Sequence, residues 1–338
     1  MRATPMMAAA ALVATLTMAW GTVPTAQQPR PATDLPILGL AGITFRVSSL
    51  ERARGYYTGV LGFAEAFSVR NAAGQVTSVF FKVNDDQFIE VTPDLEPGQI
   101  RRQGRVIVQS SDLRRLREIY VNRGVSPGPI VTGPDGNQVF RVEGPNDARI
   151  DFLEYAPGSL QTNARGRFLS PDRVSTHLWH VGIYTSDPAS RTTFYEQKLG
   201  LIGGRDLPGG RNEFIETPRS DRNLETKHPP LDPENPATRA QYDREVMGAV
   251  QHMALEVADM RVARDLVQRR GGLSDLQVRA HVGNNRHWLM HLFDPDGSRT
   301  EVMETAVQDS LPPMSVMAPG AAVAPPIRPL TPGVIPWP

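Results

Sequence analysis

Short runs of alternating hydrophobic and polar residues recur along the chain and predict β-strands. The run HVGIY, which begins at His180, places its valine and isoleucine on one face and its histidine, glycine and tyrosine on the other. A segment with apolar positions at helical spacing follows this run and stops at Gly200. More short runs come next, and DPDG at 294–297 marks a turn between two of them. The pattern predicts a strand–helix–strand–strand–strand module.

This module pattern is repeated along the chain. Three pairs of segments align without a gap between the two halves: 41–63 with 179–201, 105–113 with 252–260, and 139–154 with 289–304. They define four related modules, at roughly 40–95, 103–156, 178–219 and 250–306, of which the third is shortened. The sequence therefore predicts two halves of two modules each.

The repeated pattern resembles a known family. The histidine that opens a strand, FYEQKLGL at 194–201 and FDPDGSRTEVME at 293–304 are similar to motifs of the vicinal oxygen chelate superfamily, which includes glyoxalase I, bleomycin-resistance proteins and type I extradiol dioxygenases. The resemblance covers about residues 40–306. It implies an α+β fold of two tandem domains, each of paired βαβββ modules that form an open, curved sheet around a divalent metal. It names no single reaction, because one fold hosts many chemistries.

The ends of the chain differ in composition from its centre. Arg2 and the apolar run from Met6 to Trp20 are typical of an export signal, and the run is too short for a good membrane span. We expect cleavage before Gln27 and a periplasmic or secreted protein. The expected segments are a signal peptide (1–26), a linker (27–37), a first domain (38–158), a linker (159–177), a second domain (178–308) and a proline-rich tail (309–338).

Charge and cysteine content exclude several classes of function. The chain of 338 residues has 36 basic and 36 acidic residues, so its formal net charge is zero. A nucleic-acid-binding protein needs a basic face, and no such excess occurs. The absence of cysteine excludes disulfides, thiolate-bound zinc, iron–sulfur clusters and thiol nucleophiles. We expect a small-molecule substrate, no nucleic-acid partner and no membrane association after signal cleavage.

Three side chains of the second half are candidate metal ligands. His180 opens the third module, His252 opens the fourth, and Glu301 lies in the last strand of the fourth. Strand alternation lets all three point from one concave face if the modules pair as they do in the superfamily. Two imidazoles and one carboxylate suit Fe(II) and leave positions open for substrate and oxygen.

A fourth carboxylate distinguishes two ligand sets within the superfamily. The resemblance implies that glyoxalase I has a ligand at the end of the third module, where NEFIETP contains Glu216, whereas extradiol dioxygenases use only three ligands. Because the third module is shortened, Glu213 is an alternative at this position. A shell of two His and two Glu suits Ni, Zn, Co or Mn.

Other polar residues of the second half are candidates for catalysis. Glu216 is a candidate base, and Tyr184, in the strand of His180, is a candidate lining residue of the cup. His291 shares a strand face with His287, and this pair could donate hydrogen bonds to the ligands or carry protons. A polar strand edge explains the pair about as well. Glu304 faces away from Glu301 and is the poorer ligand.

The first half has no histidine at the equivalent positions, which are Gly42, Glu90, Arg105 and Asp151. Arg105 would put a fixed positive charge where a cation should lie. The first half can therefore keep the fold without the metal, as a scaffold, a wall of the substrate channel or a separate ligand-binding cup. We expect a buried ion pair between Glu90 and Arg105.

Three functions fit these observations. The preferred one is a glyoxalase-like lyase or isomerase with Ni, Zn, Mn or Co, in which Glu216 acts as base. An extradiol ring-cleaving dioxygenase with Fe(II) is the alternative, which the two-domain layout favours; Phe293 stands where such enzymes have a tyrosine. A binding protein of the bleomycin-resistance kind, without catalysis, is the third.

The signal peptide generates a prediction about the mature chain. Its first residue should lie between 21 and 27, because cleavage follows the apolar run. N-terminal sequencing of the protein from its native host checks this, and an intact Met1 would contradict it.

Overall fold

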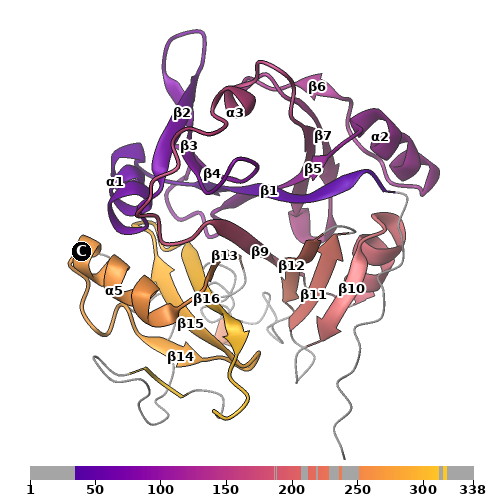
Figure 1. Cartoon of the computed structure of the whole chain (residues 1–338). Coiled ribbons are helices and arrows are strands. Elements are labelled where there is room, and N and C mark those ends of the chain that lie inside the picture. The colour runs from indigo at the N-terminus through magenta and orange to yellow at the C-terminus, as the bar shows by residue number, and fades with distance from the viewer. Residues whose placement is uncertain are drawn as a thin grey trace, which may run out of the picture. The chain divides into compact units, whose positions relative to one another are not determined.

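The computed structural model describes residues 35–317 except 186, 188, 207–211, 218–219, 228–235, 238–250 and 312–314. Within 204–223, and at 226 and 227, the residues that it describes are described by their backbone alone. Its strands form two eight-stranded sheets (Figure 1), with the orders β2-β3-β4-β1-β5-β8-β7-β6 and β10-β11-β12-β9-β13-β16-β15-β14. The expected signal peptide lies outside the described residues.

The strands of the first sheet are β1 (Ile37–Arg46), β2 (Ala64–Arg70), β3 (Val76–Lys82), β4 (Phe88–Thr92), β5 (Gln103–Ser110), β6 (Val131–Thr132), β7 (Gln138–Glu143) and β8 (Arg149–Glu154). Those of the second are β9 (His177–Tyr184), β10 (Ile202–Asp206), β11 (Asn212–Thr217), β12 (Ser220–Lys227), β13 (His252–Val257), β14 (Ala280–Val282), β15 (His287–Phe293) and β16 (Arg299–Val307).

The helices are short, and all of those named here except α3, which lies between β8 and β9, connect strands within a module. They are α1 (Leu50–Arg54), which continues as the π-helical turn η1 (Gly55–Val60), α2 (Leu113–Asn122), the 3₁₀ turn η2 (Pro145–Asp147), α3 (Leu160–Asn163), the π-helical turn η3 (Arg191–Lys198) and α5 (Met260–Gly271). No helix in the described part of the chain is both long and apolar enough to cross a bilayer.

Each sheet consists of two βαβββ modules that meet at its centre. In the first sheet β1 pairs antiparallel with β5, and these strands pair in parallel with β4 and β8. In the second sheet β9 and β13 pair in the same way with each other and with β12 and β16. The predicted α+β class with two such domains is confirmed.

The third module is complete, which corrects the sequence analysis. Its last strand, β12, ends at Lys227, beyond the predicted end at residue 219. FIET of 214–217 resembles FIEV of 88–91, but the former lies in β11 and the latter in β4, so Glu216 is not the counterpart of Glu90. The parallel pairing of β12 with β9 shows that β12 is the counterpart of β4.

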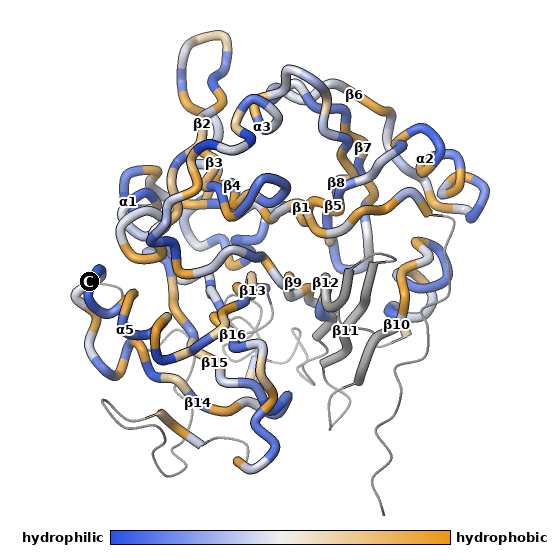
Figure 2. Tube along the Cα trace, viewed as in Figure 1, coloured by the Kyte–Doolittle hydropathy of each residue, from blue (hydrophilic) through white to orange (hydrophobic). Residues whose placement is uncertain are grey.

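One face of each sheet packs in a common hydrophobic core. Apolar and polar residues are interspersed along the strands (Figure 2), and the apolar positions of β1, β5, β9 and β13 belong to one cluster with residues of α1, α2 and α5. Gln87 ties the two sheets together, since its Nε2 donates to the carbonyl oxygens of Leu40 (3.1 Å) and Leu178 (2.9 Å). The opposite, concave face of each sheet stays outside this core.

The turn between β15 and β16 is held by tyrosines of the first sheet's helix. Tyr57 donates a hydrogen bond to Oδ2 of Asp294 at 3.3 Å, and Tyr56 donates to Thr300 at 2.9 Å. Oδ1 of Asp294 accepts from the backbone N–H groups of Asp296 and Ser298. Burial raises the pKa of Asp294 to about 6, although these hydrogen bonds act against the shift.

The raised pKa of Asp294 predicts a pH dependence of stability. Because the folded-state pKa (about 6) lies above the unfolded value (about 3.9), the native state binds more protons in between. The contribution of Asp294 to stability is therefore present below pH 4 and is lost as pH rises to 6. Asp294→Asn should remove this slope from urea unfolding curves measured between pH 4 and 7. Asp265→Asn, at an exposed position of α5, is the control and should keep it.

Candidate metal centre

A β-bulge in β9 directs His180 into the concave face. The register between β9 and β13 passes over Trp179, which is an extra residue. Leu178 packs in the common core, and in a regular strand His180 would face the same way. The extra residue shifts the alternation, so that Trp179 packs on the opposite face from Leu178 and His180 follows it. The register of β1 passes over Ala41 in the same manner.

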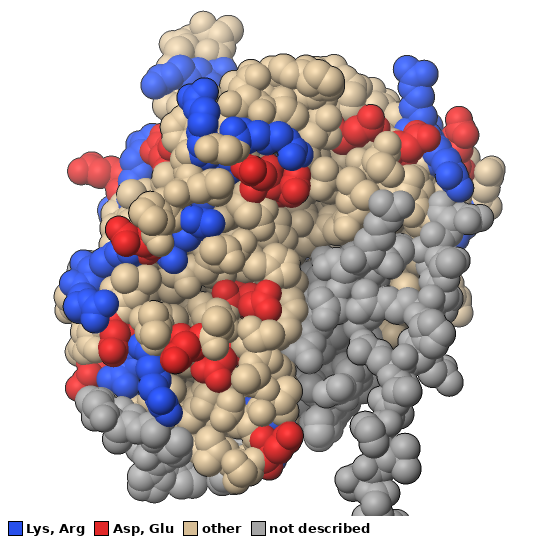
Figure 3. All heavy atoms as spheres, viewed as in Figure 1, with Lys and Arg blue, Asp and Glu red and all other residues tan. Residues whose placement is uncertain are grey.

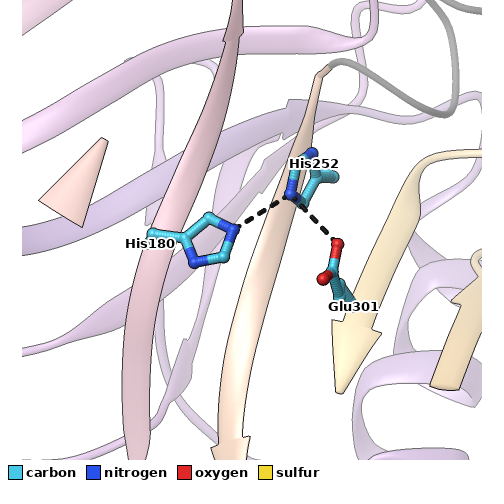
Figure 4. Close-up of side chains that lie close together, drawn as sticks. All are labelled: His180, His252 and Glu301. Carbon is cyan, nitrogen blue, oxygen red and sulfur yellow. Dashed lines mark hydrogen bonds and ion pairs between the residues drawn. The ribbon is translucent and has the colours of Figure 1, made fainter. Parts of the chain in front are cut away.

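His180, His252 and Glu301 converge on one point in the second sheet (Figure 4). Nε2 of His180 lies 3.2 Å from Nε2 of His252, and the latter lies 3.3 Å from Oε2 of Glu301. All three residues are buried, and one ligand atom of each lies within 4.8 Å of the others. Three neighbouring strands, β9, β13 and β16, supply them. The structure thus brings the three predicted ligands together.

A second carboxylate, which the sequence analysis missed, adjoins this cluster. Oε2 of Glu225 in β12 lies 3.3 Å from Nε2 of His252 and 3.6 Å from Nε2 of His180. Glu225 is buried and stands opposite Gly182 of β9. The first sheet has the same arrangement, with Glu90 of β4 opposite Thr44 of β1. Counting from this pair would have located Glu225.

The spacing of the donor atoms fits a single metal ion. Donors bound at about 2.1 Å lie about 3.0 Å apart across a right angle and about 3.4 Å apart across a tetrahedral angle. Four of the distances between these donor atoms run from 3.2 to 3.6 Å. A metal ion here would also compensate the two buried carboxylates, of which Glu301 already pairs with Arg299 at 3.2 Å. His180, His252 and Glu301 therefore form a buried metal site, and Glu225 has the position of a further donor.

The remaining predicted residues lie at different distances from the cluster. The backbone of Glu216 lies in β11, one strand further from β9 than β12, and its side chain and that of Glu213 fall outside the described part. Tyr184 is buried in the last position of β9. Nε2 of His291 lies 3.8 Å from Oε2 of Glu301, beyond a direct hydrogen bond.

His287 and Glu304 have structural contacts instead. Nδ1 of His287 donates to the backbone oxygen of Glu304 at 2.8 Å, which joins β15 to β16. The Glu304 carboxylate accepts from the N–H of Met260 at 2.8 Å, at the first turn of α5. Glu304 therefore faces away from the metal site, as the strand alternation predicted.

Two further residues shape the surroundings of Glu301. Nη2 of Arg299 donates to Oε2 of Glu301 at 3.2 Å, the same oxygen that faces His252. This hydrogen bond from Arg299 fixes the orientation of the Glu301 carboxylate, and it reduces the electron density that Oε2 can donate to a metal ion. The ring of His281 lies 5.3 Å from that of His291, and burial lowers the pKa of His281. His281 is therefore more readily neutral, as a proton acceptor must be.

The first sheet has a salt-bridge network at the equivalent place. Nη2 of Arg105 lies 2.5 Å from Glu90, and its Nε lies 3.4 Å from Asp151. Arg141 holds the same Asp151 through two hydrogen bonds of 2.6 and 2.9 Å. Burial lowers the pKa of Arg105, but the two carboxylates outweigh it and raise the pKa. The predicted ion pair of Glu90 and Arg105 is present.

Gly42 is the counterpart of His180 in the first sheet, and the backbone around it leaves no room for a side chain. A Cβ atom at Gly42 would lie 2.3 Å from the carbonyl oxygen of Phe88, in the neighbouring β4. No side chain fits at that distance while the two strands remain paired. The first sheet thus excludes a histidine at this position by backbone packing as well as by sequence.

Comparison with known proteins identifies the family. Residues 177–302 match the family model described as Glyoxalase/Bleomycin resistance protein/Dioxygenase superfamily, a span that contains the two histidines and both glutamates. Over these residues, which form most of the second domain, the chain is similar to the superfamily that its sequence motifs resemble. No curated protein matches the chain.

Solved structures of this superfamily share the fold over both sheets. The Mn(II)-bound glyoxalase from Novosphingobium aromaticivorans has a TM-score of 0.58 and 14% identity, with 80% of this chain and 83% of that chain covered. A mutant of homoprotocatechuate 2,3-dioxygenase from Brevibacterium fuscum has a TM-score of 0.58 and 16% identity (85% and 77% covered). A catechol 2,3-dioxygenase has a TM-score of 0.57 and 18% identity (80% and 89% covered).

The surface drawn in Figure 3 shows no separation of charge. Basic and acidic residues are intermixed on this face, over the regions of both sheets. The intermixing agrees with the balance of 36 basic and 36 acidic residues.

The metal site generates a prediction about metal content. His180→Ala or His252→Ala should lower metal affinity at least 10–100-fold, because each removes one of three or four ligands. Elemental analysis of the untagged protein, with circular dichroism to check folding, measures this. Asp151→Asn and Arg105→Gln are matched controls from the first sheet and should leave metal content unchanged; a fall there would reveal a second metal site.

Proposed function

We propose that this protein is a metal-dependent lyase or isomerase that acts on a small oxygenated molecule, with chemistry of the glyoxalase kind. The observation that supports the proposal is Glu225, whose Oε2 lies 3.3 Å and 3.6 Å from the two histidine Nε2 atoms. With Glu225, the site has two His and two Glu donors and leaves two positions on an octahedral ion. Two neighbouring oxygens of a substrate would fill these positions.

The four donors have distinct roles in this proposal. His180, His252 and Glu301 hold a divalent ion such as Ni, Zn, Mn or Co, which acts as a Lewis acid on a substrate oxygen when bound. Glu225 lies where it could serve either as a ligand or as the base. As the base, its carboxylate would take a proton from the substrate carbon next to the bound oxygen. Deep burial of all four residues excludes water from the proton transfer.

Residues around the donors supply positioning and proton movement. Arg299 holds Glu301 in place through the 3.2 Å hydrogen bond and so keeps this ligand from acting as the base. His291 and His281 lie in contact, on the side of Glu301 away from His180, and are proposed to pass a proton towards solvent. Tyr184 is retained as a candidate lining residue.

An extradiol ring-cleaving dioxygenase with Fe(II) is the second candidate. It is supported by the restriction of the His–His–Glu set to the second sheet and by the similarity of the whole fold to dioxygenases. In this case Glu225 is not a ligand, and three positions remain for a diol and oxygen. Export to the periplasm or exterior remains part of either proposal.

The reaction class can be tested through Glu225. Glu225→Gln should lower isomerisation of a hemithioacetal by the Ni(II) protein about 10²–10⁴-fold, because the amide cannot accept the proton. Glu216→Gln is the matched control and should have a much smaller effect. The same proteins, loaded with Fe(II), are assayed for oxygen uptake with catechols. The lyase proposal would be rejected in favour of the dioxygenase by two results together: the wild type does not isomerise the hemithioacetal, and ring cleavage persists in Glu225→Gln.

A further inference from the structure

The concave face of the first sheet contains a cavity that the metal chemistry does not use. Its volume is about 80 Å³, and Glu90, Arg105 and Asp151, the counterparts of the metal-site residues, line it. By this measure a water molecule needs about 10–15 Å³, so the cavity has room for roughly six. It is therefore large enough for a small organic molecule.

The walls of this cavity are mostly apolar. Val69 of β2, Phe80 of β3, Ile107 of β5 and Leu153 of β8 line it from four strands. The hydrophobic residues of the concave face belong to two small clusters apart from the common core, so the cavity is not a packing defect of that core. Such walls favour the non-polar part of a ligand.

A fixed cover closes part of the cavity. Nδ2 of Asn137 donates to Oε1 of Gln161 at 2.7 Å, and Nε2 of Gln161 donates to Oδ2 of Asp135 at 2.7 Å. The backbone N–H of Leu160 donates to the carbonyl oxygen of Asp135 at 2.9 Å, which holds α3 against the turn at residues 133–136, between β6 and β7. These bonds hold the cover before any ligand arrives, which lowers the entropic cost of binding.

The charges at the floor of the cavity already compensate one another. Arg105 and Arg141 carry two positive charges, and Glu90 and Asp151 carry two negative ones within salt-bridge distance. Asp135 adds a negative charge at the cover. An anionic ligand would therefore meet repulsion, and a cationic one would have to displace a guanidinium.

Two donor groups at the floor remain available. Among the described residues, neither Nη1 of Arg105 nor the hydroxyl of Ser78 has a hydrogen-bond partner, although both residues line the cavity. Every other polar side chain of floor and cover named above is paired. Both donors lie on the wall of the cavity, so a ligand oxygen that accepts hydrogen bonds could pair with them.

We propose that the first domain binds a small neutral molecule, mostly apolar, through one carbonyl-type oxygen that accepts hydrogen bonds from Arg105 and Ser78. The first domain is then a binding site in which the Arg105 guanidinium stands where the second domain would hold a metal ion.

Acetophenone is a suitable probe, because it has an apolar ring, one carbonyl oxygen and no charge. Isothermal titration of the full chain should show one saturable site that Ile107→Trp abolishes by filling the cavity. Ser78→Ala should weaken binding about five- to tenfold, as expected for one hydrogen bond. Val121→Trp adds the same side chain at an exposed position of α2 and should bind like the wild type.

Two further titrations separate this site from the metal centre and from non-specific uptake. His252→Ala, which disables the metal site, should bind acetophenone with unchanged affinity. Benzoate, the matched anion, should bind at least tenfold more weakly. Absence of saturable binding at millimolar acetophenone, binding that survives Ile107→Trp, or binding lost in His252→Ala would each overturn the proposal.

Discussion

Each of the two cups gathers buried carboxylates at the same two places, and these carboxylates need a positive charge. The strands next to the central pair supply them: Glu90 and Asp151 in the first sheet, Glu225 and Glu301 in the second. Buried carboxylates without a cation would cost several kcal/mol. The first sheet meets the need with Arg105 and Arg141, whereas in the second Arg299 pairs with Glu301 and two imidazoles suit a metal ion. One electrostatic requirement thus has two solutions on the same scaffold.

The common core makes it possible for the cups to diverge. One face of both sheets and the larger helices pack in a single cluster, so that stability is concentrated on the side away from the cups. Changes on the concave faces, such as Arg105 for a histidine, leave that core untouched. The hydrogen bonds of Gln87 and of Tyr57 tie the halves together on this side. Fold and chemistry are therefore carried by opposite faces of each strand.

Much of this arrangement could be predicted from the sequence, because strand alternation and internal repetition are local signals. His180, His252 and Glu301 followed from matched positions in the modules, and the ion pair of Glu90 and Arg105 followed from the loss of histidine. Glu225 could not be found in this way, since two similar glutamate motifs lie on adjacent strands and the alignment selected β11 instead of β12. The bulge at Trp179 was also missed, because a bulge depends on pairing with another strand.

The close approach of Phe88 to Gly42 has a consequence for the history of the chain. A duplicated domain can lose a metal ligand by one substitution, but here the reverse substitution, at Gly42, would place a Cβ 2.3 Å from the carbonyl oxygen of Phe88 in β4. Regaining a histidine would require the strand to move first, at a cost to the sheet. Backbone packing of this kind makes the loss of the histidine hard to reverse, and it keeps the two domains in separate roles.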